Sequence, residues 1–75
     1  MSGGTETEKR KLRTILRQIR QEANVRQIDL AAKLAKPQSF ISKYESGEQT
    51  LDFFEVKEVC EALNISMHDF IKRLE

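Results

Sequence analysis

The stretch RQIDLAAKLAKPQSFISKYESG, from Arg26 to Gly47, decides the fold of this chain. Its first part has apolar residues at helical spacing and predicts a helix over about 27–34. Pro37 suits the first turn of a second helix, because its fixed φ fits that position and its missing N–H costs nothing there. Gly47 ends this second helix, which we expect over about 37–46. The stretch therefore predicts two short helices joined by a tight turn.

Helical spacing and capping residues predict three more helices around this pair. Apolar residues recur at helical spacing from about Lys9 to Ala23. Asn24 and Asn64 follow two of the helices, and asparagine tolerates the left-handed conformation of a helix end. The two downstream helices each begin with a capping residue that an acid follows three positions later, namely Asp52 with Glu55 and Ser66 with Asp69.

These elements predict an all-α fold, a compact five-helix bundle. We expect residues 1–8 to form a disordered tail, because they include no large apolar residue beyond Met1. Residues 9–75 would form a single domain. The inward-facing positions we expect in the four helices after the first are Ile28, Ala31, Leu34, Phe40, Ile41, Tyr44, Val56, Val59, Cys60, Leu63 and Phe70.

Some apolar residues exceed what a small core can cover. Phe53 and Phe54 are adjacent on one helix, so both cannot point inward, and we expect one of them to be exposed. The last helix has an apolar stripe at the end of the chain, of which Phe70 is the expected core member. Met67, Leu74 and Phe53 are therefore the predicted contacts of a homodimer.

Charge is distributed unevenly along the chain. Up to Lys43 there are ten basic and four acidic residues, for a net charge of +6, and from Tyr44 onward there are three basic and eight acidic residues, for a net charge of −5. A basic front half is typical of proteins with a polyanionic partner. The alternative is a solvated surface whose asymmetry arises by chance.

Several classes of protein are disfavoured. We expect no enzyme, cofactor or metal site, because the sequence has no metal-ligand cluster, catalytic triad or phosphate-binding loop. Cys60 is the only cysteine and fits a small buried position, and His68 fits a helix surface. No signal peptide, membrane span or small-molecule site is evident. We expect a cytoplasmic protein, bacterial or phage-encoded and associated with the nucleoid.

Five groups of residues, taken in order, resemble the lambda-repressor-like and Cro-type helix-turn-helix domains, the XRE-like family. They are Gln27-x-x-Leu30-Ala31, Leu34, Gln38-Ser39-x-Ile41-Ser42, Glu45-x-Gly47 and Ala62-Leu63-Asn64-Ile65-Ser66. The resemblance covers about residues 12–74. It implies a DNA-binding domain of five helices whose third helix enters the major groove.

The resemblance also implies roles for individual residues. Those expected to contact bases are Gln38, Ser39, Ser42 and Lys43. Those expected to contact phosphates are Gln27, Arg26, Lys36 and Ser46. Arg20 and Glu45 are expected to form an ion pair that fixes the third helix against the first. The alternative for Arg20 is a phosphate contact.

Three positions depart from the family pattern. Ala35 stands where glycine is usual, so a left-handed turn there would cost about 1 kcal/mol. Arg26 replaces a capping Ser or Thr, which costs about 1 kcal/mol but adds a cation. The loop 47–52 carries acids and no Lys or Arg. Because phosphate neutralisation dominates DNA affinity, we expect weak binding by a monomer.

The sequence thus predicts a sequence-specific, double-stranded DNA-binding transcriptional regulator. It would act as a homodimer on a roughly palindromic operator. The alternative is a protein-interaction module that keeps the helix-turn-helix fold without binding DNA, and the acidic 47–52 loop is its main support.

Overall fold

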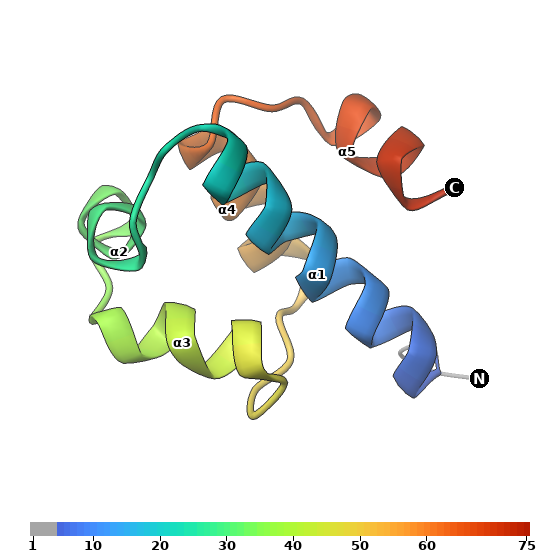
Figure 1. Ribbon diagram of the computed structural model, residues 1–75, viewed down its shortest axis with the longest axis horizontal. Coiled ribbons are helices and arrows are strands. Elements are labelled where there is room, and N and C mark those ends of the chain that lie inside the picture. The colour runs from blue at the N-terminus through green and yellow to red at the C-terminus, as the bar shows by residue number, and fades with distance from the viewer. Residues whose placement is uncertain (1–4) are drawn as a thin grey trace.

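Five helices, and no strands, make up residues 5–75, which are the residues that this computed structural model describes (Figure 1). Their bounds are α1 Glu6–Glu22, α2 Gln27–Leu34, α3 Gln38–Ser46, α4 Phe53–Ala62 and α5 Met67–Leu74. The predicted all-α, five-helix fold is confirmed. None of the described helices combines the length and apolarity needed to cross a membrane.

Helix α1 begins at Glu6, three residues before the predicted start. Thr5 is its N-cap: the Thr5 hydroxyl accepts a hydrogen bond from the Glu8 N–H at 3.1 Å, and the Glu8 carboxylate accepts one from the Thr5 N–H at 2.8 Å. This capping box satisfies two backbone N–H groups at the helix start. Residues 5–8 are therefore a cap and a first turn rather than part of a disordered tail, and residues 1–4 lie outside the described residues.

The predicted caps of α4 and α5 are confirmed. Asp52 Oδ1 accepts from the Glu55 N–H at 2.7 Å, and Glu55 Oε1 accepts from the Asp52 N–H at 2.9 Å. Ser66 Oγ accepts from the Asp69 N–H at 3.0 Å. The asparagines Asn24 and Asn64, which follow α1 and α4, have positive φ angles of 58° and 63°.

The turn between α2 and α3 is left-handed at Ala35, with φ 55° and ψ 42°. The Lys36 N–H donates to the Ala31 carbonyl at 2.9 Å, which closes the end of α2. Pro37 is extended, with ψ 155°, and serves as the N-cap of α3. Helix α3 therefore begins at Gln38, one residue later than predicted. The turn keeps its geometry without glycine, at a cost of about 1 kcal/mol.

The core lies where α1, α2, α3 and α4 meet, and Phe70 of α5 closes it. Its members, all 6% exposed or less, are Leu16, Ile19, Leu30, Ala31, Ile41, Tyr44, Val56, Val59, Cys60, Leu63 and Phe70. The buried position predicted for Cys60 is confirmed, and burial raises the pKa of its thiol to about 11. Cys60 therefore stays a neutral, apolar packing residue.

The prediction that Ile28 faces inward is wrong. Ile28 is 53% exposed, whereas Leu30 is fully buried. Residues two apart on a helix point about 200° away from each other, so only one of the two can face the core. Leu30 and Ala31 are the residues that α2 buries.

Two apolar sites also differ from expectation. Phe53 and Phe54 are both exposed, at 63% and 73%, and their rings pack edge to face with centroids 5.6 Å apart. On α5, Phe70 is buried as predicted, while Met67 and Leu74 are half-buried against the core of their own chain. Ile71 is the exposed apolar residue of that helix.

Candidate nucleic-acid interface

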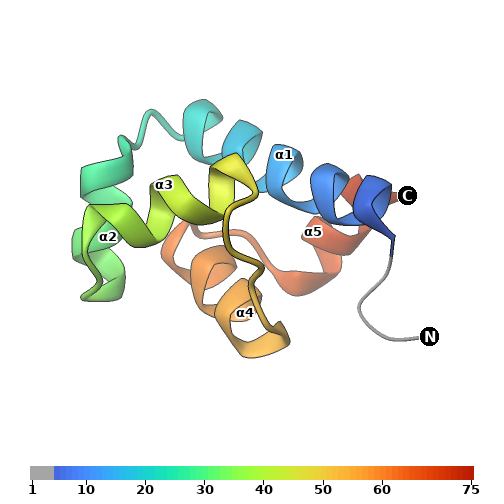
Figure 2. The same cartoon turned by 90° about the horizontal axis from the view of Figure 1, so that it is seen from below.

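The outer side of α3 is polar and open to solvent. Ile41 and Tyr44 turn the other side of the helix into the core. Gln38, Ser39 and Lys43 are exposed and Ser42 is half-buried. Helix α3 lies across the front of the molecule in Figure 2. The four predicted base contacts thus share one helix, and their side chains lie on the side of α3 that does not face the core.

A buried ion pair fixes α3 against α1. Arg20 Nε lies 2.7 Å from Glu45 Oε2, and Arg20 Nη2 lies 3.0 Å from Glu45 Oε1. Arg20 Nη1 also donates to the Val25 carbonyl at 2.8 Å. The Arg20 and Glu45 side chains are only 10% and 5% exposed. Hydrogen bonding to Glu45 raises the pKa of Arg20, so the guanidinium stays charged despite its burial.

Two glutamines extend this pair to the outer side of α3. Gln27 Nε2 donates to Glu45 Oε1 at 3.0 Å, and Gln38 Nε2 donates to Gln27 Oε1 at 3.4 Å. A continuous polar chain therefore runs from Arg20 in α1 to Gln38 at the start of α3. It orients one amide at the first turn of α3, the turn that in this motif approaches base edges.

The residues predicted to contact phosphates lie around α3, and each makes a different interaction within the protein. Arg26 is tied to Asp29, with Nε to Oδ2 at 2.9 Å, although its side chain is 78% exposed. Asp29 Oδ2 also accepts from the Arg26 N–H at 3.1 Å, which satisfies that N–H, whereas the Arg26 side chain itself makes no capping hydrogen bond. The hydrogen bond from Arg26 lowers the pKa of Asp29. Lys36 Nζ lies 5.3 Å from the ring centre of Phe40. The Ser46 hydroxyl donates to the Lys43 carbonyl at 3.1 Å.

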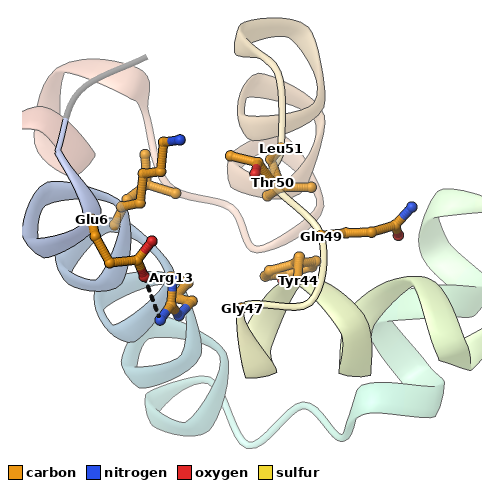
Figure 3. A pocket seen from close by; sticks show the side chains of 9 residues that line it. Glu6, Arg13, Tyr44, Gly47, Gln49, Thr50 and Leu51 are labelled. Atoms are coloured by element: carbon orange, nitrogen blue, oxygen red, sulfur yellow. Dashed lines mark hydrogen bonds and ion pairs between the residues drawn. The ribbon is translucent and has the colours of Figure 1, made fainter.

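The sequence did not reveal a contact beside Gly47, at the end of α3. Gly47 has φ 88°, and a Cβ built on it would lie 2.7 Å from Arg13 Cζ. The Arg13 guanidinium therefore rests against the glycine, and its Nη2 lies 3.3 Å from Glu6 Oε2. These groups surround a cavity of about 150 Å³ that also touches Lys9 and the loop from Gln49 to Leu51 (Figure 3). The i, i+4 spacing of Lys9 and Arg13 is the one sequence signal that a shared face exists.

Tyr44, near this end of α3, points into the core. Its side chain is 1% exposed, and its ring meets that of Phe40 edge to face at 5.9 Å. Within residues 5–75 the hydroxyl has no hydrogen-bond partner. Burial raises the pKa of Tyr44 well above its ordinary value.

Comparisons with known proteins agree with this geometry. A family model described as helix-turn-helix matches residues 16–70. A solved structure, an XRE-family like protein from Pseudomonas syringae pv. tomato str. DC3000, is similar with a TM-score of 0.86 and 32% sequence identity, over 91% of this chain and 83% of that chain. No curated protein matches the chain. The chain belongs to the XRE family of helix-turn-helix domains, a DNA-binding regulatory fold.

Proposed function

We propose that this protein is a sequence-specific, double-stranded DNA-binding transcriptional regulator that places α3 in the major groove. The observation that carries the proposal is the polar chain that ends in Gln38. A side chain held in place before binding loses less conformational entropy when it contacts a base. This hydrogen-bonded network therefore supports Gln38 as the main residue that recognises the DNA sequence.

The polar side chains of α3 have the chemistry of base recognition. A glutamine can form two hydrogen bonds to adenine, through N6 and N7. Serine can bond to several bases, which suits Ser39 and Ser42. Lysine can reach O6 and N7 of guanine, which suits the exposed Lys43. Each well-formed bidentate contact discriminates against the wrong base by about 1–3 kcal/mol.

Phosphate contacts are proposed for Gln27, Arg26, Lys36 and Ser46. Gln27 is the first residue of α2, where backbone N–H groups lack partners within the helix and attract anions. Arg26 and Lys36 add exposed positive charge on either side of α2. The Asp29 carboxylate reduces the contribution of Arg26, because it already binds that guanidinium.

We further propose that the protein acts as a homodimer on a roughly palindromic operator. Two copies of a short recognition helix, set about one DNA turn apart, read two half-sites. Among the predicted dimer contacts, Phe53 is the most exposed, and its partner Phe54 extends the same apolar surface. Met67 and Leu74 have less area left to contribute, because they already pack on their own core.

Selection of bound sequences from random duplex DNA tests the proposal. The wild-type protein should enrich a palindromic motif, and its mass at the same concentration should be that of a dimer. Gln38→Ala should relax the preference at one base position of each half-site. Gln21→Ala, which removes an exposed glutamine from α1, should leave the motif unchanged. No enrichment by the wild-type protein would contradict the proposal.

A second candidate function is a protein-interaction module without DNA binding. The loop after α3 favours it, because Glu48 and Asp52 are exposed and no Lys or Arg accompanies them in the loop. In that case the double variant Gln38→Ala, Lys43→Ala would keep partner binding intact. Loss of DNA binding in this variant, together with unchanged folding, would favour the first candidate.

A further inference from the structure

Two cations of α1 line the cavity beside the end of α3. The loop from Gly47 to Asp52 has no Lys or Arg, but Lys9 and Arg13 line the cavity that this loop borders. Lys9 and Arg13 are four residues apart, so they share one face of α1. The helix thus brings two positive charges to a loop whose charged residues are all acids.

Gly47 allows this close approach. An added Cβ would lie 2.7 Å from Arg13 Cζ, 2.9 Å from Nη2 and 3.1 Å from Nε, so any side chain there would displace the guanidinium. The Arg13 side chain is 18% exposed, which leaves it packed in the cavity wall but still in contact with solvent. The guanidinium therefore packs against the glycine without its charge being fully buried.

Arg13 has one weak charged partner. Its Nη2 lies 3.3 Å from Glu6 Oε2, and the Glu6 side chain is 70% exposed (Figure 3). An ion pair this exposed contributes about 0–1 kcal/mol, so an anion from solution can replace the carboxylate. The two cations and one carboxylate give the cavity wall a net charge of +1.

The cavity also lies in a suitable place for a phosphate. Helix α2 lies beside one end of α3, and the loop and the first turns of α1 lie beyond the other end (Figures 1 and 2). Helix α3 has nine residues, and so is about 13 Å long. The major groove is about 12 Å wide, with a phosphate backbone along each edge. A helix in the groove therefore needs anion-binding groups beyond both of its ends.

We propose that Lys9 and Arg13 of α1 form a site for a DNA backbone phosphate beside Gly47, in place of cations in the loop. The inference rests on the proposed function and names a part of its binding surface. Glu6 holds Arg13 in the free protein, and the phosphate takes its place in the complex. The ligand chemistry is that of a phosphate anion, and the duplex is its source.

The salt dependence of duplex binding tests this site. The slope of log K against log salt is negative, and each of Lys9→Gln and Arg13→Gln should reduce its magnitude by about 0.9, the value for one lost phosphate contact. Glu6→Gln frees Arg13 and should tighten binding, by up to about fivefold. Lys11→Gln is the matched control, because Lys11 is exposed and lies about 200° around the helix from both cations. It should leave the slope near that of wild type.

The outcomes separate the site from the proposed function. If the wild-type protein binds duplex and all three variants, Lys9→Gln, Arg13→Gln and Lys11→Gln, keep its salt slope, the proposed phosphate site is wrong and the proposed function stands. If the wild-type protein does not bind duplex, both are wrong.

A parallel titration with inorganic phosphate should shift the Gly47 amide resonance only weakly. Saturation of that resonance at low phosphate, with no change in duplex binding on Arg13→Gln, would overturn the DNA source. Circular dichroism of Lys9→Gln and Arg13→Gln guards against loss of folding.

Discussion

Two arginines of α1 meet the same end of α3 in different ways. Arg13 and Arg20 are seven residues apart, so they lie on one face of the helix, about 10 Å apart along its axis. Arg20 is buried and gives three hydrogen bonds, to Glu45 and to the Val25 carbonyl. Arg13 reaches only an exposed carboxylate, at 3.3 Å, and lies against Gly47.

The difference shows what makes an arginine structural. Arg20 is already paired through two hydrogen bonds with a buried carboxylate, so a phosphate would have to compete with that carboxylate. Arg13 keeps most of its donors free of such partners and reaches solvent. Burial and the number of acceptors, rather than residue type or position on the helix, separate the two roles. The alternative that Arg20 itself binds phosphate is therefore disfavoured by its contacts.

The largest expected effect comes from breaking the buried contact. Glu45→Ala leaves the Arg20 guanidinium without its carboxylate and Gln27 without its acceptor, so the free energy of unfolding should fall by about 3 kcal/mol or more. Urea unfolding measures the change. The double variant Arg20→Met, Glu45→Leu should lose much less, because neither charge then remains unpaired. Equal losses in the single and double variants would show that the pair is not a unit.

A smaller effect is expected at the other contact. Gly47→Ala forces a left-handed alanine and displaces the flexible end of the Arg13 side chain, so the free energy of unfolding should fall by about 1–2 kcal/mol. In an Arg13→Ala background the steric part disappears, and the loss should shrink to about 1 kcal/mol. Urea unfolding of the four proteins gives the coupling directly. A coupling of zero would mean that the guanidinium moves aside freely.

The smallest of the three effects isolates backbone strain from both arginines. Ala35 is left-handed and exposed, so Ala35→Gly should raise the free energy of unfolding by about 0.5–1 kcal/mol. Thermal and urea unfolding both report the change. Ala32→Gly, at an exposed position inside α2, should instead lower stability by about 1 kcal/mol. A loss of stability in Ala35→Gly would show that the turn does not need a left-handed residue.

Features governed by nearby residues could be predicted from the sequence. The Asp52–Glu55 capping box, the Ser66 cap and the left-handed asparagines each depend on interactions within a few positions of the chain. The same is true of the number and order of the helices. The family resemblance added the Arg20–Glu45 contact, which joins residues that are 25 positions apart.

Features that depend on packing between helices could not be predicted. Ile28 and Leu30 are equally apolar, and only the position of α2 on the core decides that Leu30 is buried. Phe53 and Phe54 are both exposed, because α4 turns Val56, Val59 and Cys60 to the core and leaves its first turn outside. The approach of Arg13 to Gly47 depends on how α1 crosses the end of α3, which no local pattern encodes.

Tyr44 gives this molecule a built-in optical reporter. The chain has one tyrosine and no tryptophan, so its near-ultraviolet absorbance and emission come almost entirely from α3. Because the folded state raises the pKa of that phenol, folding keeps it neutral at pH values where a free tyrosine ionises. The stability that this provides is complete below about pH 10 and declines as the pH rises further. Detachment of α3 would therefore appear as tyrosinate absorbance in alkaline solution, and docking of the helix could be followed without any label.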